Sequence, residues 1–185
     1  MCGGYILEVA GGKGALATAL GTRGMKVLMV DPRPPDVSDK PDELESEAVE
    51  GEDVHPVGSV DRICEHFDDS SMELVFGAEV VVAMHPDEAT DAIVDAALTA
   101  QRPFAVVPCC VFPRLFHHRR LHNGGGVVGY TGLLRFLREK DPRIRAARLP
   151  FAGRNVVLYM TKGDFAAQKQ DDVGPLHAPN WVRPD

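Results

Sequence analysis

The sequence predicts one domain of the α/β class, with a doubly wound, mostly parallel sheet covered by helices on both faces. Two observations predict it. Strongly apolar runs of strand length alternate with segments of helical composition, and the patterned part of the chain closes in a hairpin that places one antiparallel strand in the sheet. The 185 residues, of which 44% are hydrophobic and 25% charged, fit one soluble domain and are too few for two.

The first part of the chain contains three predicted strands and one helix. Residues 5–10 are an apolar run that ends in a glycine-rich turn, which predicts a buried strand. Residues 15–20 have the composition of a helix, and the glycines that follow would close it. Residues 26–30 are a second apolar strand, and residues 60–67 are a third strand with a weaker pattern.

The second part of the chain alternates in the same way and ends in the hairpin. Its apolar runs predict strands, and its segments with apolar residues on one side predict helices. The turn of the hairpin is centred on Gly153. The predicted elements are a strand at 78–84, a helix at 87–100, a strand at 104–107, a helix at 130–140 and the two hairpin strands at 144–151 and 155–161.

Acidic and basic residues are separated along the chain. Residues 31–60 carry ten acids against two bases, and residues 101–154 carry eleven bases against two acids. The stretch at 32–59 contains prolines and few large apolar side chains, so we expect a solvated acidic loop there. The domain is predicted over 1–163, with a tail at 164–185 in which Trp181 is able to dock. The basic excess indicates either a phosphate-contacting face or exposed arginines distributed around helices.

Several classes of protein are excluded by the composition. No apolar stretch reaches the roughly 18 residues that a membrane span requires, and the first apolar run lacks the basic region that precedes a secretory signal. Four cysteines, two of them adjacent, do not form the disulfide framework of a small secreted domain. We therefore expect reduced thiols in an intracellular compartment, the cytoplasm rather than an organelle, and no membrane partner.

The residues that follow each parallel strand are the candidate ligand-binding residues, because ligands of such folds lie outside the carboxyl ends of the strands. Small residues at 10–12 let the backbone approach a ligand, and Gly14 permits close packing of helix on strand. Asp31 ends the next strand, close to the spacing at which an acid binds ribose hydroxyls. The alternative is a turn without a ligand, in which Asp31 only ends its strand.

This loop resembles the first motif of the class I S-adenosylmethionine-dependent methyltransferases, which reads E/D-x-G-x-G-x-G. Ala10 stands in place of the first glycine. The resemblance covers residues 4–162 and implies a class I methyltransferase-like sheet of seven strands with an antiparallel last strand. It assigns S-adenosylmethionine to the loop, its ribose hydroxyls to Asp31, and its adenine to Asp69 or the neighbouring Asp68. The cofactor-binding residues that it implies are Glu8, Ala10, Gly11, Gly12, Gly14, Asp31 and Asp69.

His85 follows the strand at 78–84, where this superfamily places its substrate-facing motif. The pattern His85-x-x-x-Ala-Thr-Asp, followed by Cys109 and Cys110 after the next strand, resembles a subgroup that includes the tRNA 2′-O-methyltransferases of the acceptor stem and uncharacterised relatives. An imidazole can accept a proton during methyl transfer, so His85 is the candidate catalytic residue. Alternatively His85 and Asp87 cap the following helix, and for Asp87 we expect the N-cap.

We expect no metal site. Cys109, Cys110, His117 and His118 are residue types that bind zinc, but two adjacent cysteines share one ion awkwardly and no second CxxC accompanies them. Small buried thiols at a strand end are the simpler interpretation. The histidines and the arginines beside them are then a polar loop near the mouth of the pocket, able to touch a substrate phosphate.

Three functions are consistent with these features. The leading hypothesis is an S-adenosylmethionine-dependent methyltransferase that acts on RNA, contacted through the basic residues at 101–154. The second is a non-catalytic methyltransferase-like scaffold or assembly factor, favoured by Ala10 and by the lack of the helices that family members carry before the first strand. That lack indicates either a truncated sequence or a pocket without part of its lid. The third, an NAD-dependent oxidoreductase, is disfavoured because the loop spacing does not suit a pyrophosphate.

Overall fold

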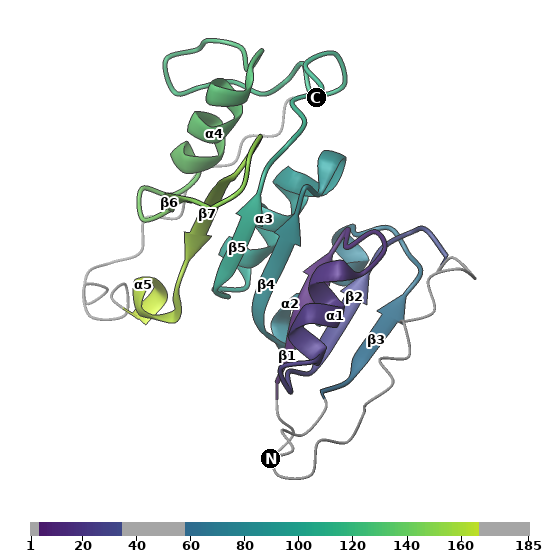
Figure 1. The fold of residues 1–185 in the computed structure, drawn as a ribbon. Helices are drawn as coiled ribbons and strands as arrows, with labels where there is room; N and C mark the ends of the chain where they lie inside the picture. Colours follow the sequence, from purple (N-terminus) through teal and green to yellow (C-terminus); the bar gives the residue numbers. More distant parts are fainter. Residues whose placement is uncertain (1–3, 35–57, 167–185) are drawn as a thin grey trace, which may run out of the picture.

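The computed structural model describes residues 4–34 and 58–166, and the described strands form one seven-stranded sheet (Figure 1). The strands lie in the order β3-β2-β1-β4-β5-β7-β6. Their bounds are β1 Tyr5–Val9, β2 Val27–Val30, β3 Val60–Ile63, β4 Ala78–Met84, β5 Phe104–Val107, β6 Arg145–Arg148 and β7 Val156–Met160. The helices are α1 Ala15–Gly21, α2 Met72–Gly77, α3 Thr90–Thr99, α4 Tyr130–Glu139 and α5 Lys162–Ala166.

The strands pair in parallel from β3 to β5, and the closing hairpin reverses the direction. β1 pairs in parallel with β2 on one side and with β4 on the other. β7 pairs antiparallel with β5 and with β6. These pairings confirm the predicted mostly parallel sheet with an antiparallel strand from a C-terminal hairpin. The strand order reverses between β1 and β4, so a ligand crevice is expected at the carboxyl ends of these two strands.

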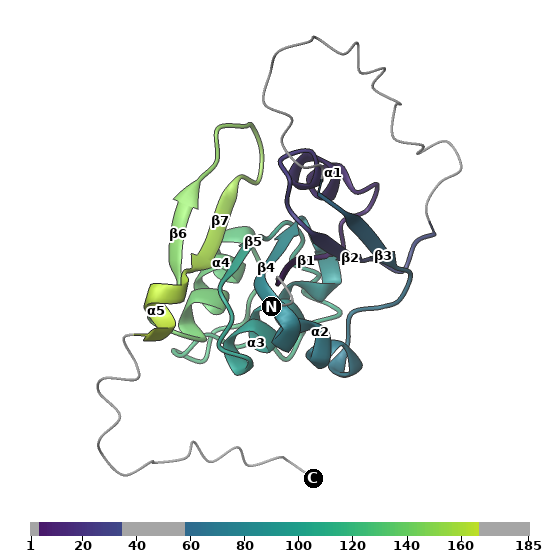
Figure 2. The same cartoon turned by 90° about the horizontal axis from the view of Figure 1, so that it is seen from below.

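Helices cover both faces of the sheet, because successive side chains of a strand point to opposite faces. On one face the strands pack with Val75 of α2, Ile93 of α3 and Leu133 of α4 in the larger core. On the other face Val27 of β2 packs against Ala17 of α1 in a smaller core. Figure 2 shows α1 on the opposite side of the sheet from α2 and α3. The doubly wound arrangement is therefore confirmed for the described residues.

The structure differs from the predicted elements between β3 and β4. β3 ends at Ile63, because the chain then turns toward a 3₁₀ segment at Asp69–Ser71, whose N-cap is Asp68. The Asp68 side chain accepts hydrogen bonds from the N–H and the hydroxyl of Ser70, at 2.8 and 2.6 Å. Helix α2 was not predicted, because its six residues run into β4 without a turn that the sequence pattern would reveal.

Two further element ends differ from the predictions. A 3₁₀ turn at Asp87–Ala89 precedes α3, which begins at Thr90 and not at residue 87. Helix α5 crosses the predicted domain end at 163, and its Phe165 is buried in the larger core. The packed domain therefore continues at least to Phe165.

Parts of the sequence predictions lie outside the described residues. These are most of the acidic loop, at 35–57, and the tail from 167 onward, including Trp181. Among the helices at 4–34 and 58–166, none combines the length and the apolar composition that crossing a membrane requires.

Candidate functional site

A cavity of about 530 Å³ lies at the carboxyl ends of β1, β2 and β4, where the strand order reverses. Its volume is in the range of small-molecule and cofactor sites. The loops after these strands supply most of its wall, and the rest comes from the segments after β3 and β5 and from the start of α3. The lining residues are Val9, Ala10, Val30, Asp31, Pro32, Arg33, His66, Phe67, His85, Pro86, Asp87, Glu88, Ala89, Ala92 and Phe112.

The glycine-rich loop after β1 meets this cavity at Ala10, whereas Gly11, Gly12 and Gly14 do not line it. Gly11 lets the loop pack closely against Met29 of β2, because a Cβ at residue 11 would lie 2.5 Å from Sδ of Met29. Gly14 is the N-cap of α1 and has φ of 79°, a left-handed conformation that glycine adopts without strain. Ala10 also adopts a left-handed conformation, with φ of 55°. The backbone at residue 10 therefore has the conformation that the glycine of the methyltransferase motif would adopt freely.

Asp31 follows β2 and connects the loop to the neighbouring strand. Its side chain is only 1% exposed, although it lies in the cavity wall. Oδ2 accepts hydrogen bonds from the Gly12 N–H at 2.8 Å and from Nη2 of Arg33 at 3.1 Å. Oδ1 accepts from the N–H and Nε of Arg33, at 2.9 and 3.1 Å. These four donors fill the roughly four acceptor positions of a carboxylate.

The charge state of Asp31 follows from these contacts. Burial raises the pKa of the carboxyl group, but the hydrogen bonds from Arg33 and Gly12 outweigh burial and lower the pKa below its usual value. Arg62 also lies near, with its Nη2 3.7 Å from Oδ1. Asp31 is therefore an ionised carboxylate in the cavity wall. The side chain of Arg33 is 69% exposed, so it can leave Asp31 at little cost in packing.

Glu8 lies beneath the glycine-rich loop and does not line the cavity. Its side chain is 1% exposed, and among the described residues its Oε2 has no hydrogen-bond partner. Burial raises the pKa of Glu8 to about 7, and the nearby charge of Asp31 contributes in the same direction. Glu8 therefore supports the loop from below as a carboxyl group that is partly protonated near neutral pH.

Strained backbone conformations gather at the cavity. Besides Ala10, three non-glycine residues that line the cavity have positive φ: His85 at 55°, Asp87 at 47° and Phe112 at 44°. Such conformations cost of order 1–3 kcal/mol each and cluster at functional sites. In the described part of the chain, Gln101 is the one further non-glycine residue with positive φ, and it lies elsewhere. The strain supports the assignment of this cavity as the functional site.

His85 projects from the end of β4 toward the tip of the closing hairpin. Its N–H donates to the carbonyl of Val107 at 3.0 Å, which fixes the backbone beside β5. Its ring lies edge-on to that of Phe151, with 6.3 Å between centroids. Phe151 is 39% exposed. The imidazole therefore lies between the cavity and an exposed aromatic side chain.

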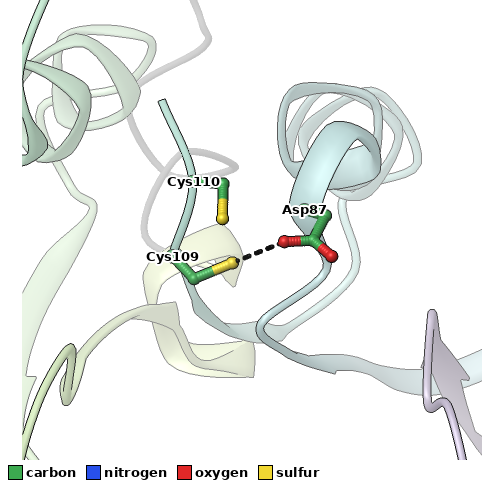
Figure 3. Close-up of side chains that lie close together, drawn as sticks. All are labelled: Asp87, Cys109 and Cys110. Atoms are coloured by element: carbon green, nitrogen blue, oxygen red, sulfur yellow. Dashed lines mark hydrogen bonds between the residues drawn. The ribbon is translucent and has the colours of Figure 1, made fainter. Parts of the chain in front are cut away.

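Asp87 does not cap the helix that follows it, so that expectation was wrong. The N-cap of α3 is Ala89, and neither the 3₁₀ turn nor α3 has a side-chain cap. The Asp87 carboxylate instead accepts a hydrogen bond from the thiol of Cys109 at 3.0 Å (Figure 3). Hydrogen bonds from Cys109 and Cys110 lower the pKa of Asp87. The cap is lost because the positive φ of Asp87 turns its carboxylate toward the end of β5.

The structure brings some predicted site residues together and separates others. Ala10, Asp31 and His85 line the cavity, whereas the two acids predicted for adenine do not. Asp69 is exposed in the 3₁₀ turn before α2. His66 and Phe67 line the cavity at the corresponding place after β3. These two residues were not predicted for the site, because the sequence pattern continues the third strand to residue 67, whereas β3 ends at Ile63.

The polar loop at 117–122 contains one arginine that is not available to a ligand. Arg119 is fully buried and pairs with Asp91 through Nε at 2.8 Å and Nη2 at 3.0 Å. Its Nη1 donates to the carbonyl of Val111, and its guanidinium lies 3.8 Å from the centre of the Phe116 ring. Arg119 therefore attaches the segment between β5 and α4 to helix α3.

Comparisons with known proteins found similarity to solved structures only. No model of a protein family matches the chain, and no curated protein matches its sequence. Three of the similar solved structures are of methylating enzymes. The magnesium protoporphyrin IX methyltransferase of Synechocystis PCC 6803 with bound SAM is 12% identical, covering 85% of this chain and 68% of that one, with a TM-score of 0.43.

The other two are also described as methylating enzymes. An rRNA methylase from Streptococcus thermophilus is 14% identical, covering 84% of each chain, with a TM-score of 0.46. A SAM-dependent methyltransferase from Methanosarcina mazei is 15% identical, covering 91% of this chain and 78% of that one, with a TM-score of 0.39. At these identities no substrate carries over from the solved structures to the present chain.

Proposed function

We propose that this protein is an S-adenosylmethionine-dependent methyltransferase. The observation that carries the proposal is the ionised Asp31 carboxylate, which lies in the cavity wall at the strand-order reversal and is hydrogen-bonded to the glycine-rich loop through Gly12. A carboxylate at the end of β2 is the group that binds ribose hydroxyls in nucleoside-binding α/β folds. The resemblance of the loop to the methyltransferase motif specifies the nucleoside.

The cavity residues fit such a cofactor in shape and in charge. Asp31 would accept hydrogen bonds from the ribose hydroxyls once the side chain of Arg33 moves away, and the backbone at Ala10 would lie against the cofactor. Asp87 and Glu88 add two more carboxylates to the wall, so the cavity favours a positively charged ligand. Phe67 offers an apolar surface for the adenine ring. When bound, the cofactor supplies an electrophilic methyl group on a sulfonium.

His85 is proposed as the residue that faces the acceptor. The hydrogen bond to Val107 fixes its backbone, and its ring lies edge-on to Phe151 at the cavity wall. An imidazole there can take the proton that a hydroxyl or amino group loses as it is methylated. In-line positioning contributes as well, because holding two reactants in the right geometry removes much of the entropic barrier.

RNA is the acceptor that we propose, and one surface supports it. Arg148 and Arg154 are exposed and flank Phe151 along the chain of the β6–β7 hairpin. Phe151 itself lies next to His85. Unpaired bases stack on exposed aromatic rings, and arginines bind the phosphates between them. A single-stranded or flipped-out nucleotide is the form of RNA that suits this arrangement.

A binding measurement with Asp31 variants tests the cofactor assignment. Asp31→Ala should lower the affinity for S-adenosylhomocysteine by roughly 1–3 kcal/mol, the value of hydrogen bonds to a charged group. Calorimetric titration measures it, with NAD titrated in parallel to separate the oxidoreductase alternative. Asp61→Ala removes an exposed carboxylate on the neighbouring β3 and is the matched control. Equal affinities of a folded Asp31→Ala protein and the wild type would contradict the proposal.

The non-catalytic scaffold is the second candidate, because Arg33 and Gly12 already occupy the acceptor positions of Asp31. Arg33→Ala separates the two candidates. If Arg33 only competes with the cofactor, this variant should bind S-adenosylhomocysteine more tightly than the wild type does. If neither protein binds it, the cavity is closed to the cofactor and the scaffold function is favoured.

A further inference from the structure

We propose that Asp87, Cys109 and Cys110 form a binding site for one thiophilic divalent cation of the zinc class. The Sγ atoms of the two cysteines and a carboxylate oxygen of Asp87 all lie within 4.8 Å of one another. This thiol–carboxylate cluster contains Asp87 in place of the two histidines, His117 and His118, that the sequence offered as zinc ligands. In the described residues, His117 and His118 belong to no such group.

The fold brings the three side chains together from two neighbouring strands. Asp87 lies in the turn after β4, and the cysteines follow β5, which pairs in parallel with β4. The carboxyl ends of the two strands therefore meet at one edge of the sheet. Figure 3 shows both sulfur atoms turned toward the space beside the Asp87 carboxylate. Adjacent cysteines thus direct their thiols to one place here, against the expectation from their spacing.

The donor set selects the class of cation. Two thiolates and one carboxylate are ligands of Zn²⁺, which is borderline-soft and tetrahedral. Mg²⁺ and Ca²⁺ require oxygen ligands and would not use the sulfurs. Three protein ligands leave one position of a tetrahedral ion for water or for a heteroatom of a substrate, as in catalytic zinc sites. Asp87 also lines the cavity, so the cation would lie beside it.

The protons of the two thiols must leave when the cation binds. Without the cation, the Cys109 thiol donates a hydrogen bond to the Asp87 carboxylate at 3.0 Å and therefore carries its proton. On binding, two sulfur–metal bonds form, two S–H bonds break and the protons pass to the buffer. No electron is transferred. Two thiolates and one carboxylate then outweigh the charge of a divalent cation by one unit.

Metal titration of the full, reduced chain tests the site. Protein freed of metal is titrated with Co²⁺, which reports thiolate ligands by a charge-transfer band, and Zn²⁺ is then used to displace it. We expect one equivalent of Co²⁺ with a thiolate band. Cys109→Ser, Cys110→Ser and Asp87→Asn should each weaken binding by roughly tenfold or more. Cys64→Ser is the control, because Cys64 is an exposed thiol outside the cluster.

Two results would overturn the site. One is a wild-type protein without a thiolate band at one equivalent of Co²⁺. The other is a double Cys109→Ser, Cys110→Ser variant that binds Co²⁺ as the wild type does. Cys110 is only half-buried, so Cys110→Ser keeps the test valid if Cys109→Ser does not fold. The titration does not depend on the proposed methyltransferase function, which S-adenosylhomocysteine binding by the metal-free protein tests separately.

Discussion

Ala10 holds a conformation that costs an alanine about 1–2 kcal/mol, because its Cβ approaches the following carbonyl oxygen when φ is positive. Ala10→Gly removes this cost, and the greater freedom of glycine in the unfolded chain cancels part of the gain. We expect the free energy of unfolding in urea to rise by about 0.5–1 kcal/mol. Ala19→Gly, within helix α1, should instead lower it by about 1 kcal/mol. Destabilisation by Ala10→Gly would show that the methyl group contributes packing instead of strain.

Glu8 makes the stability of the folded protein depend on pH between about 4.5 and 7. Its pKa in the folded chain is about 7, against 4.5 for a free side chain. Between these values the folded state holds a proton that the unfolded state has lost, so stability falls as the pH rises from 4.5 to 7 and is then constant. The loss should be about 2–3 kcal/mol. Asp31, whose folded pKa is lowered, acts below pH 4 with the opposite sign.

Glu8→Gln tests this assignment, because it keeps the shape of the side chain and removes its titration. Urea denaturation at pH 5 and pH 8 should show a smaller difference in stability for the variant than for the wild type. Glu65→Gln changes an exposed side chain and is the control. A wild type equally stable at both pH values would contradict the raised pKa.

At the scale of elements, Arg119 connects the segment between β5 and α4 to helix α3. Arg119→Ala leaves the partly buried Asp91 without its partner, and breaking such a pair costs roughly 3–5 kcal/mol. We expect a loss of that size in urea denaturation. Arg120→Ala, which removes an exposed neighbour bonded to backbone carbonyls, should change stability little. The double variant Arg119→Ala, Asp91→Ala should lose less than the two single variants together. Additive losses would exclude a coupled pair.

Apolar patterns predicted most elements, because the spacing of apolar residues in a strand or an amphipathic helix follows from which of its faces is buried. Strand β5 and helix α4 illustrate this: the first was predicted at its observed bounds and the second within one residue. Helix α2 was missed because six residues show no periodicity before β4 begins. The ends of β1, β2 and β4 located Ala10, Asp31 and His85 at the cavity, since parallel strands share one carboxyl edge. Side-chain partners such as Arg33 for Asp31 depend on rotamers, which no sequence pattern specifies.

At the scale of the whole molecule, the basic excess at 101–154 is compensated in part by acids from other elements. Five of these bases form ion pairs with acids: Arg119 with Asp91, Lys140 with Asp95, Arg135 with Glu139, Arg143 with Asp141, and Arg145 with Asp164. Three of the five acids, Asp91, Asp95 and Asp164, lie outside residues 101–154. A count of charges along the sequence therefore overstates the field that a nucleic acid would meet, and the exposed arginines of the hairpin become the decisive ones.

The salt dependence of RNA binding tests the proposed acceptor surface. Each phosphate contact on a single strand contributes about 0.7 to the slope of log K against log salt. Replacing both Arg148 and Arg154 by alanine should therefore reduce the slope by roughly 1.4, measured by fluorescence anisotropy with a labelled single-stranded RNA. Arg135→Ala, which removes a base already paired with Glu139, should leave the slope nearly unchanged. An unaltered slope in the hairpin variant would exclude this surface.

The pairing of Arg33 with Asp31 has a consequence for the time course of ligand capture. A sugar can reach the carboxylate only during the moments when the guanidinium has swung into solvent. The observed binding rate should then become independent of ligand concentration at high concentration. Its limiting value would equal the rate at which the Arg33–Asp31 ion pair opens.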